Sequence, residues 1–384
     1  MIEIVAWALL LPPAIATLVL TVELIAAQWP LRRAEVTIRP RIAIIVPAHD
    51  EAAGIGVTIA TLRNAAPGGT RLIVVADNCS DATAALARSA GADDVIERDE
   101  PERRGKGFAL AFARNRLAAD PPDVAIVVDA DCSMSGGGMA RLAAAAQASG
   151  CPVQSAYMMR PRPDLGTLVC LSGFAFLVRN LVRQRGLAQL GAPALLTGSG
   201  MAFRWDVFAS APLATADMVE DLSLGIALAR AGRPPLFLPD TATWSEPAPR
   251  PATVAQRTRW EHGFLHTARQ AALPLLAERQ WPLIWLGLHL LVPPLALLVA
   301  VDGATLVLLF ALARAGSTAL PFILLASVLI AAMLLLGVSW ARFGRAQISG
   351  GRLLLIPFYI LWKMPIYLGA LIRPERRWIR TKRN

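Results

Sequence analysis

The chain has 384 residues, 55% of them hydrophobic, with a mean hydropathy of +0.48 and a formal net charge of +10. This composition is too apolar for an ordinary soluble protein. The positive charge does not indicate a nucleic-acid partner, because the basic residues cluster beside apolar stretches and no RNP, zinc-finger or helix-turn-helix signature is present. These clusters are Arg32, Arg33, Arg39 and Arg41, then Arg373 to Arg383.

Residues 4–27 are apolar apart from Glu23. About 24 such residues are enough to cross a hydrocarbon core of ~30 Å. A cleaved signal peptide is the alternative, but the segment carries Glu3 in place of a basic start, and its positive charges follow it. We therefore predict an uncleaved transmembrane anchor over residues 1–28, with the following residues in the cytoplasm.

From residue 41 to 250 the pattern changes to short β-rich runs that alternate with Ala-rich helical stretches. The runs at 42–46, 71–75 and 124–128 have the composition of buried parallel strands. This alternation predicts an open α/β sheet with helices on both faces, in which ligands bind beyond the carboxyl ends of the strands.

Asp129 and Asp131 directly follow the strand predicted at 124–128. Two carboxylates one residue apart at a strand end can bind one hard cation, Mg²⁺ or Mn²⁺, whose remaining ligands are phosphate oxygens and water. The alternative is a solvated turn. We predict a metal site that neutralises a diphosphate leaving group.

Glu220 and Asp221 open an amphipathic helical pattern. An acidic pair at a helix start often serves only to complement the helix dipole. The functional interpretation is that Asp221 is a general base that takes a proton from an acceptor hydroxyl.

Gln256-Arg-Thr-Arg259-Trp260 is an uncommon combination within an amphipathic helix predicted over 251–280. Gln256 and Trp260 share a helix face, with Arg259 adjacent. Arginine suits a diphosphate, and Trp260 offers a flat wall to a sugar ring. The alternative is an interfacial helix that faces lipid headgroups.

Residues 281–384 are again membrane-like. We expect two spans, at 285–313 and 320–340, although Pro293, Pro294 and Asp302 interrupt the first. The apolar stretch 352–372 carries Lys363, and a charge at the bilayer centre costs ~2.5–3.5 kcal/mol, so we predict a re-entrant or interfacial helix there. The basic tail would then return to the cytoplasm.

Cysteine and histidine spacings offer little chemistry. The four cysteines form no Cys-x-x-Cys pair, so we predict reduced thiols and neither a zinc nor a redox motif. His262 and His266 are spaced i, i+4, but no third ligand is apparent nearby, and we predict a structural or interfacial role.

The order of these acidic and Gln-x-x-Arg-Trp clusters, between apolar ends, resembles the membrane-bound family 2 glycosyltransferases, which include cellulose, hyaluronan and poly-N-acetylglucosamine synthases. The resemblance covers about residues 41–270. It implies a GT-A fold, which is a Rossmann-like nucleotide-sugar-binding domain, flanked here by transmembrane and interfacial helices.

The resemblance also implies roles for further residues. The Pro47-Ala-His-Asp-Glu51 segment looks like the family's first-strand nucleotide motif, with Pro47 and Glu51, although Asp50 stands where Asn is usual. Asp77 matches the acidic strand-end motif for the uridine group, and Lys106 the Gly-Lys segment that approaches the nucleotide. Asp129, Gln256, Arg259 and Trp260 complete the nucleotide-sugar set. Val219 replaces the usual Thr before the acidic pair.

Leu196-Thr-Gly-Ser-Gly200 is a candidate close-approach loop on the acceptor side, with Gly198 and Ser199 at its centre. Its glycines would equally serve a tight turn.

We therefore predict an inverting, metal-dependent glycosyltransferase that moves a sugar from a UDP-sugar to a lipid-linked or growing polysaccharide acceptor. It would be a multi-pass protein of the cell inner membrane, with its catalytic domain in the cytoplasm and possible polysaccharide-synthesis or export subunits as partners. The alternatives are a single-sugar transferase to a lipid, like ceramide glucosyltransferases, and a non-catalytic membrane scaffold. The sequence does not identify the sugar or the acceptor.

Overall fold

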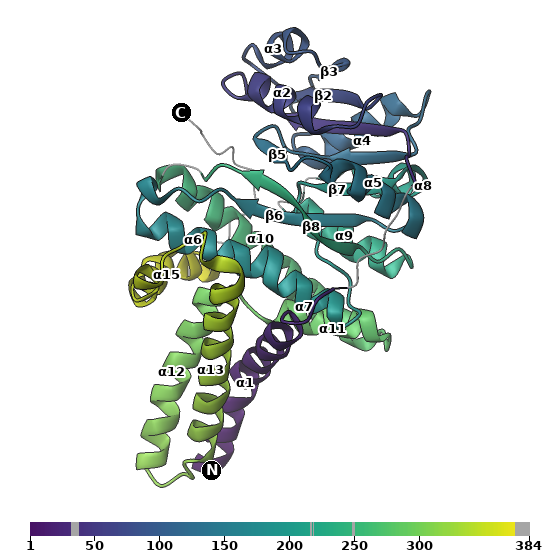
Figure 1. Ribbon diagram of the computed structural model, residues 1–384. Coiled ribbons are helices and arrows are strands. Elements are labelled where there is room, and N and C mark those ends of the chain that lie inside the picture. The colour runs from purple at the N-terminus through teal and green to yellow at the C-terminus, as the bar shows by residue number, and fades with distance from the viewer. Residues whose placement is uncertain (32–37, 216, 218, 248–249, 373–384) are drawn as a thin grey trace. The chain divides into compact units, whose positions relative to one another are not determined.

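The computed structural model describes residues 1–31, 38–215, 217, 219–247 and 250–372, with the side chains of 250–256 and 370–372 excepted (Figure 1). The chain divides into two compact units. We call them the sheet unit (Leu31–Arg160 and Pro193–Ala248) and the helical unit (Met1–Pro30, Pro161–Ala192 and Pro249–Glu375).

The sheet unit is built on an eight-stranded mixed sheet with the strand order β3–β2–β1–β4–β7–β6–β8–β5. The first four of these strands are parallel, β7 is antiparallel to both of its neighbours, β8 is parallel to β6, and β5 is antiparallel to β8. The strands are β1 (Ile42–Ala48), β2 (Arg71–Asp77), β3 (Asp94–Arg98), β4 (Val124–Val127), β5 (Cys132–Met134), β6 (Val153–Met159), β7 (Met201–Arg204) and β8 (Leu236–Ser245).

The central strands are buried on both faces, which confirms the expectation from their unbroken apolar runs. On one face, Ile45, Val75 and Val127 pack in a cluster that also contains Phe203 and Phe208. The helices of this unit are α2 (Ile55–Ala65), α3 (Thr83–Ser89), α4 (Lys106–Leu117), α5 (Gly138–Ser149), α8 (Trp205–Ser210) and α9 (Glu220–Arg230).

The strand register brings the chemically important residues to one edge of the sheet. β1 pairs in parallel with β2 on one side and with β4 on the other, with Ile45 opposite both Ile73 and Val127. The carboxyl ends of these strands therefore meet at the same edge. Asp77 ends β2, Asp129 follows β4, and ligands bind at this edge in open sheets of this kind.

The helical unit contains three helices in its described part that are long and apolar enough to cross a membrane. α1 (Ile2–Ala26), α12 (Leu295–Arg314) and α13 (Leu320–Ser339) lie side by side (Figure 1). The other elements are η1 (Pro163–Leu165), α6 (Thr167–Leu177), the π-helix η2 (Val178–Arg183), α7 (Gln184–Gln189), α10 (Arg250–Ala277), α11 (Trp281–Leu291), the π-helix η3 (Trp340–Gly344), α14 (Gly350–Leu353) and α15 (Ile356–Ile372).

The stretch expected as one span over 285–313 is two helices. α11 ends at Leu291, and α12 begins at Leu295, after Pro294 at its N-cap. Two consecutive prolines lack the N–H groups that would continue the hydrogen-bond ladder, so the helix stops there.

A buried charge cluster ties α1 to two other segments of the helical unit. Glu23 Oε2 accepts a 2.6 Å hydrogen bond from Arg183 Nε, and Glu23 Oε1 lies 2.7 Å from Nδ1 of His289. The side chains of all three residues are at most 5% exposed. A carboxylate inside an apolar helix is costly unless it is paired, so this cluster fixes the packing of α1 against η2 and α11.

We predict that Arg183→Met destabilises the protein by about 3–5 kcal/mol, because it leaves the Glu23 carboxylate buried without its guanidinium partner. Thermal unfolding in detergent, followed by tryptophan fluorescence, measures the effect. Arg185→Met is the matched control, since Arg185 is less buried and donates to the backbone oxygens of Ala27 and Trp29. Equal shifts for the two variants would contradict the role of the cluster.

Candidate active site

Two aspartates lie just beyond β4, on a turn that the backbone fixes in place. Asp129 N donates to Ser199 Oγ at 3.0 Å, and Cys132 N donates back to Asp129 O at 3.0 Å. Ligand atoms of Asp129, Asp131 and Cys132 all lie within 4.8 Å of one another. Burial raises the pKa of the Cys132 thiol well above its usual range, and the Asp131 and Asp129 charges add to this. The thiol stays protonated, so the donors that fit a hard cation are the two carboxylates.

Lys106 begins α4 and turns its ammonium group to Asp129. Its Nζ pairs with Asp129 Oδ1 and donates to the backbone oxygen of Gly198 at 2.5 Å. Burial opposes this charge, but the carboxylates of Asp129, Glu220 and Asp221 outweigh it and raise the lysine pKa. Gly107 permits this position, since a Cβ there would lie 2.4 Å from the backbone oxygen of Leu213.

The loop 197–200 brings the acidic groups together. Gly198 has a φ of +87°, and a Cβ built on it would lie 3.2 Å from Asp221 Oδ2, 3.3 Å from Lys106 Nζ and 3.9 Å from Asp129 Oδ2. Residues far apart in the sequence therefore surround one backbone position, where only glycine adopts the φ and leaves the space.

Gln154 on β6 holds this loop, although the sequence analysis did not single it out. Its Oε1 accepts from Thr197 N at 2.9 Å, and its Nε2 donates to the backbone oxygen of Ser199 at 2.9 Å. The side chain is fully buried. The signal in the sequence that could have identified this residue was its amide side chain within the strand Val153–Met159. A polar side chain that is buried in a sheet needs hydrogen-bond partners.

Glu220 and Asp221 form the first turn of α9. Desolvation, followed by the neighbouring charge of Asp221, raises the pKa of Glu220 from 4.5 to about 8, against the opposing effect of Lys106. Glu220 is therefore a neutral acid at pH 7, beside a second carboxyl group. A carboxyl group whose environment raises its pKa in this way can donate a proton or a hydrogen bond near neutral pH.

At the end of β2, Asp77 belongs to a buried ion pair. Its Oδ1 accepts from Arg98 Nη1 at 2.5 Å and from Asn78 Nδ2 at 2.9 Å. Arg98 also donates to Glu100 at 3.0 Å. Arg98 was not among the residues expected at the site, and its partner is the carboxylate to which the sequence assigned nucleotide binding.

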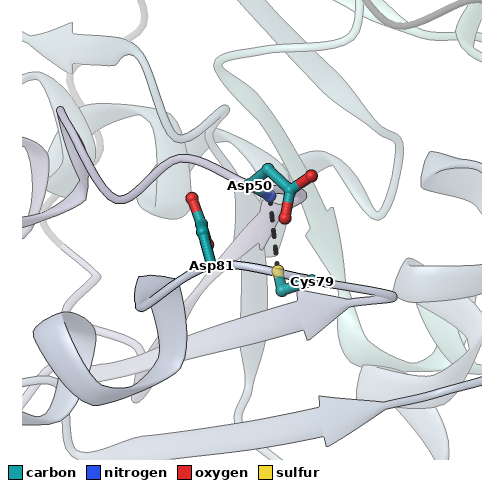
Figure 2. Close-up of side chains that lie close together, drawn as sticks. All are labelled: Asp50, Cys79 and Asp81. Carbon is teal, nitrogen blue, oxygen red and sulfur yellow. Dashed lines mark hydrogen bonds between the residues drawn. The ribbon is translucent and has the colours of Figure 1, made fainter.

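The loop after β1 approaches the loop after β2. Asp50, at a φ of 52°, donates from its backbone N to Cys79 Sγ at 3.4 Å, and its Oδ1 accepts from Ser80 N at 2.6 Å; Asp81 lies beside this pair (Figure 2). Burial raises the pKa of the Cys79 thiol, so these contacts fix the loops rather than offering a thiolate ligand.

Two further residues of the expected first-strand motif lie next to this loop. Pro47 lies within β1, opposite Val75, and Glu51 N donates to Thr83 Oγ1 at 2.8 Å.

The Gln-x-x-Arg-Trp segment lies on α10 in the helical unit. The Trp260 ring lies 5.6 Å from the Phe176 ring, and the Arg257 guanidinium lies 4.9 Å from the Trp260 ring centroid. Arg259 is half-buried on the same helix, and the side chain of Gln256 is outside the described residues. His262 Nε2 lies 2.9 Å from the backbone oxygen of Ile366, which agrees with the expected structural role.

The model of the glycosyltransferase-like family 2 matches residues 40–263, more than half of the chain. The chain belongs to this family. It is therefore a glycosyltransferase, and the match spans the strand-end aspartates, the acidic pair and the Gln-x-x-Arg-Trp segment. A search of curated proteins gave no match.

A solved structure shows the same fold. The mannosyltransferase PcManGT from Pyrobaculum calidifontis, in complex with GDP-Man and Mn²⁺, is 20% identical, with a TM-score of 0.59 over 95% of this chain and 100% of that one. The glucosyl-3-phosphoglycerate synthase from Mycobacterium tuberculosis, in complex with Mn²⁺, UDP and phosphoglyceric acid, is 24% identical, with a TM-score of 0.41 over 61% and 84% of the two chains. The mixed sheet is the Rossmann-like GT-A fold, as predicted.

We predict that Glu220 makes stability fall as the pH rises from about 4.5 to about 8. Its folded-state pKa is raised above the unfolded value, so the folded protein resists the ionisation that the unfolded chain undergoes. Metal-free Glu220→Gln should gain stability relative to the parent over this window. Unfolding at pH 5.5 and pH 8.5 measures it, with Glu102→Gln as the exposed control. A pH-independent difference would contradict the burial effect.

Gln154→Leu should reduce transfer by about 10- to 100-fold, because small displacements of positioned groups have effects of this size. It removes the side chain that bonds Thr197 and Ser199 and thereby frees the loop that surrounds Gly198. Transfer rates and unfolding curves of the purified variant test this, with exposed Gln270→Leu as the control. An unchanged rate would mean that other contacts hold the loop.

Proposed function

We propose that this protein is an inverting, metal-dependent transferase that moves a sugar from a UDP-sugar to a lipid-linked or growing polysaccharide acceptor. The observation that carries the proposal is the convergence of Lys106, Asp129 and Asp221 around the Gly198 backbone, at the carboxyl edge of the sheet. Such a reaction needs a positively charged group, a carboxylate that can bind the metal, and a separate carboxylate that can act as the base.

Asp129 and Asp131 would hold the Mg²⁺ or Mn²⁺ ion. The bound ion supplies charge neutralisation to the diphosphate leaving group. Lys106 is placed to add a second positive charge on the same side, because its ammonium already pairs with Asp129. The metal ion and Lys106 would favour departure of the nucleotide and would take no part in removing the proton of the acceptor.

Asp221 would act on the acceptor. Its carboxylate takes the proton of the acceptor hydroxyl while the hydroxyl oxygen forms a bond to the anomeric carbon. The bond from that carbon to the β-phosphate oxygen breaks, and its electron pair leaves on the diphosphate. One displacement inverts the anomeric centre, so an α-linked donor yields a β-linkage. Glu220, neutral at pH 7, is suited to donate a hydrogen bond that orients the acceptor.

The nucleotide-sugar set would comprise Pro47, Glu51, Asp77, Lys106 and Asp129 within a catalytic domain of residues 41–250. Gln256, Arg259 and Trp260 would join it from an interfacial helix at 251–280. Gly198 and Ser199 would face the acceptor.

A GDP-sugar is a second candidate donor, because the structural relative with a TM-score of 0.59 carries GDP-Man and Mn²⁺. The base-recognising loops after β1 and β2 decide between the two nucleotides. Transfer assays with matched UDP- and GDP-sugars separate the candidates.

The acceptor and the membrane setting are also part of the proposal. Three described helices are long and apolar enough to span a bilayer, and the Arg32–Arg41 cluster follows the first of them. Positive charges favour the cytoplasmic side, so we place the catalytic domain at the cytoplasmic face of the inner membrane. The alternatives are a single transfer to a lipid, and a scaffold role that the complete set of acidic groups argues against.

We predict that Asp221→Asn lowers transfer by ~10²–10⁴-fold, the usual contribution of positioned proton transfer. UDP and Mn²⁺ binding should persist, because the leaving-group side is intact. Glu220→Gln should have a milder effect, since an amide resembles the neutral acid. Calorimetric titration with UDP and Mn²⁺, beside a transfer assay, distinguishes the cases. Near-normal transfer would remove Asp221 from the mechanism, and loss of UDP binding would make it structural.

A further inference from the structure

One oxygen of the Asp77 carboxylate is already occupied by donors from the protein. Oδ1 accepts a hydrogen bond from Arg98 Nη1 at 2.5 Å and another from Asn78 Nδ2 at 2.9 Å. A carboxylate oxygen has two lone-pair positions, and these two hydrogen bonds fill them. Oδ1 therefore has no acceptor position left for a ligand.

The other oxygen of this carboxylate, Oδ2, is open. Within the described part of the chain, no group donates a hydrogen bond to it. The Asp77 side chain is only 9% exposed, and a carboxylate oxygen that is mostly removed from water needs a donor from an ordered water or a ligand. Asp77 therefore offers a ligand one acceptor atom and not two.

The first donor, Arg98, is held in position on several sides. It is the register partner of Asp77 on the neighbouring strand β3, and its Nη2 donates to Glu100 Oε2 at 3.0 Å. Its guanidinium group lies 5.6 Å from the ring centroid of Phe108. Because the residue is only 4% exposed, the guanidinium has little freedom to turn away from Asp77.

The second donor, Asn78, is held by the end of β3. Its backbone N donates to the backbone oxygen of Arg98 at 2.6 Å, and its Oδ1 accepts from Glu100 N at 2.8 Å. A backbone N–H only donates, so the side-chain oxygen must face Glu100 and the amide nitrogen is left to face Asp77. The φ of 50° at Asn78 is one that asparagine adopts more readily than most residues. The fold therefore fixes both donors to Oδ1.

Nucleobases differ in the number of adjacent donors that they present to a carboxylate. Uracil has one imide N–H, at N3, between two carbonyl groups. Guanine has N1–H and its 2-amino group side by side, and a carboxylate binds this pair with both of its oxygens. A carboxylate with one available oxygen satisfies uracil but leaves one donor of guanine without a partner, which costs free energy.

We propose that Arg98 and Asn78 determine the base specificity of the donor site by occupying Oδ1 of Asp77. The remaining oxygen, Oδ2, accepts the single imide N–H of uracil, and the site discriminates against guanine. Both residues act through Asp77 and are positioning residues. The inference rests on the proposed function, in which Asp77 binds the nucleotide, and it favours a UDP-sugar over a GDP-sugar.

Calorimetric titrations of the full-length protein with UDP, GDP and inosine diphosphate, in the presence of Mn²⁺, test the proposal. Inosine diphosphate has the purine ring and the N1–H of GDP but lacks the 2-amino group, so it separates the number of donors from the size of the base. We expect UDP to bind about tenfold or more tightly than GDP, and inosine diphosphate about fivefold or more tightly than GDP, the scale of one base-reading contact. Equal affinities for inosine diphosphate and GDP would overturn the proposal, and this comparison needs no variant to fold.

Asn78→Gly removes one donor to Oδ1 and keeps the backbone conformation accessible. It should reduce the preference for inosine diphosphate over GDP to about twofold or less, because the freed lone pair can accept from the 2-amino group. UDP binding should persist. Asn115→Gly makes the same substitution at an exposed position of α4 and should keep the preference of the parent. An unchanged preference in Asn78→Gly would contradict the proposal.

The same titrations separate a failure of this inference from a failure of the proposed function. Mn²⁺-dependent binding of UDP and GDP with equal affinity would overturn the base specificity alone. Absence of Mn²⁺-dependent binding of any of the three nucleotides to the parent would overturn the proposed function and this inference with it.

Discussion

The site depends on one electrostatic constraint, which is that several carboxylates share a poorly hydrated space with a single ammonium group. Asp129, Glu220 and Asp221 all act on Lys106, and their combined charge raises its pKa. Burial, and then the charge of Asp221, raise the pKa of Glu220 to about 8 against the opposing effect of Lys106. A space with surplus negative charge favours a divalent cation, and the cation in turn favours a diphosphate. This charge balance supports the proposed donor, which carries a diphosphate.

Backbone geometry imposes this constraint. The parallel strands β1, β2 and β4 end at one edge, and the antiparallel β7 places the loop 197–200 against the turn that follows β4. Gly198 leaves the space in which Lys106, Asp129 and Asp221 approach one another. Gln154 holds the loop through hydrogen bonds with three of its backbone groups. The hydrogen bonds of Gln154 therefore help to position the charged groups indirectly, through the backbone of the loop.

The parallel half of the sheet could be predicted from sequence, because runs such as Ile42–Val46 and Leu72–Val75 are apolar throughout, and short β-branched apolar runs are typical of buried strands. Asp129 and Asp131, the proposed metal ligands, could be located at a strand end for the same reason. Gln154 could not be identified, because its partners lie 43 to 46 positions away along the chain. Arg98 could not be identified either, because its partner lies 21 positions away. Nor did the pattern reveal the mixed order of β5 to β8, which follows from long-range pairing.

The central claim is that the carboxylates beyond β4 bind a metal that holds the nucleotide diphosphate. The most direct measurement is the affinity for UDP of the parent and of Asp131→Asn across a Mn²⁺ titration. The account predicts that Mn²⁺ strengthens UDP binding to the parent and has little effect on the variant, while the two proteins bind UDP alike without metal. Equal UDP affinity for both proteins at every Mn²⁺ concentration would contradict it.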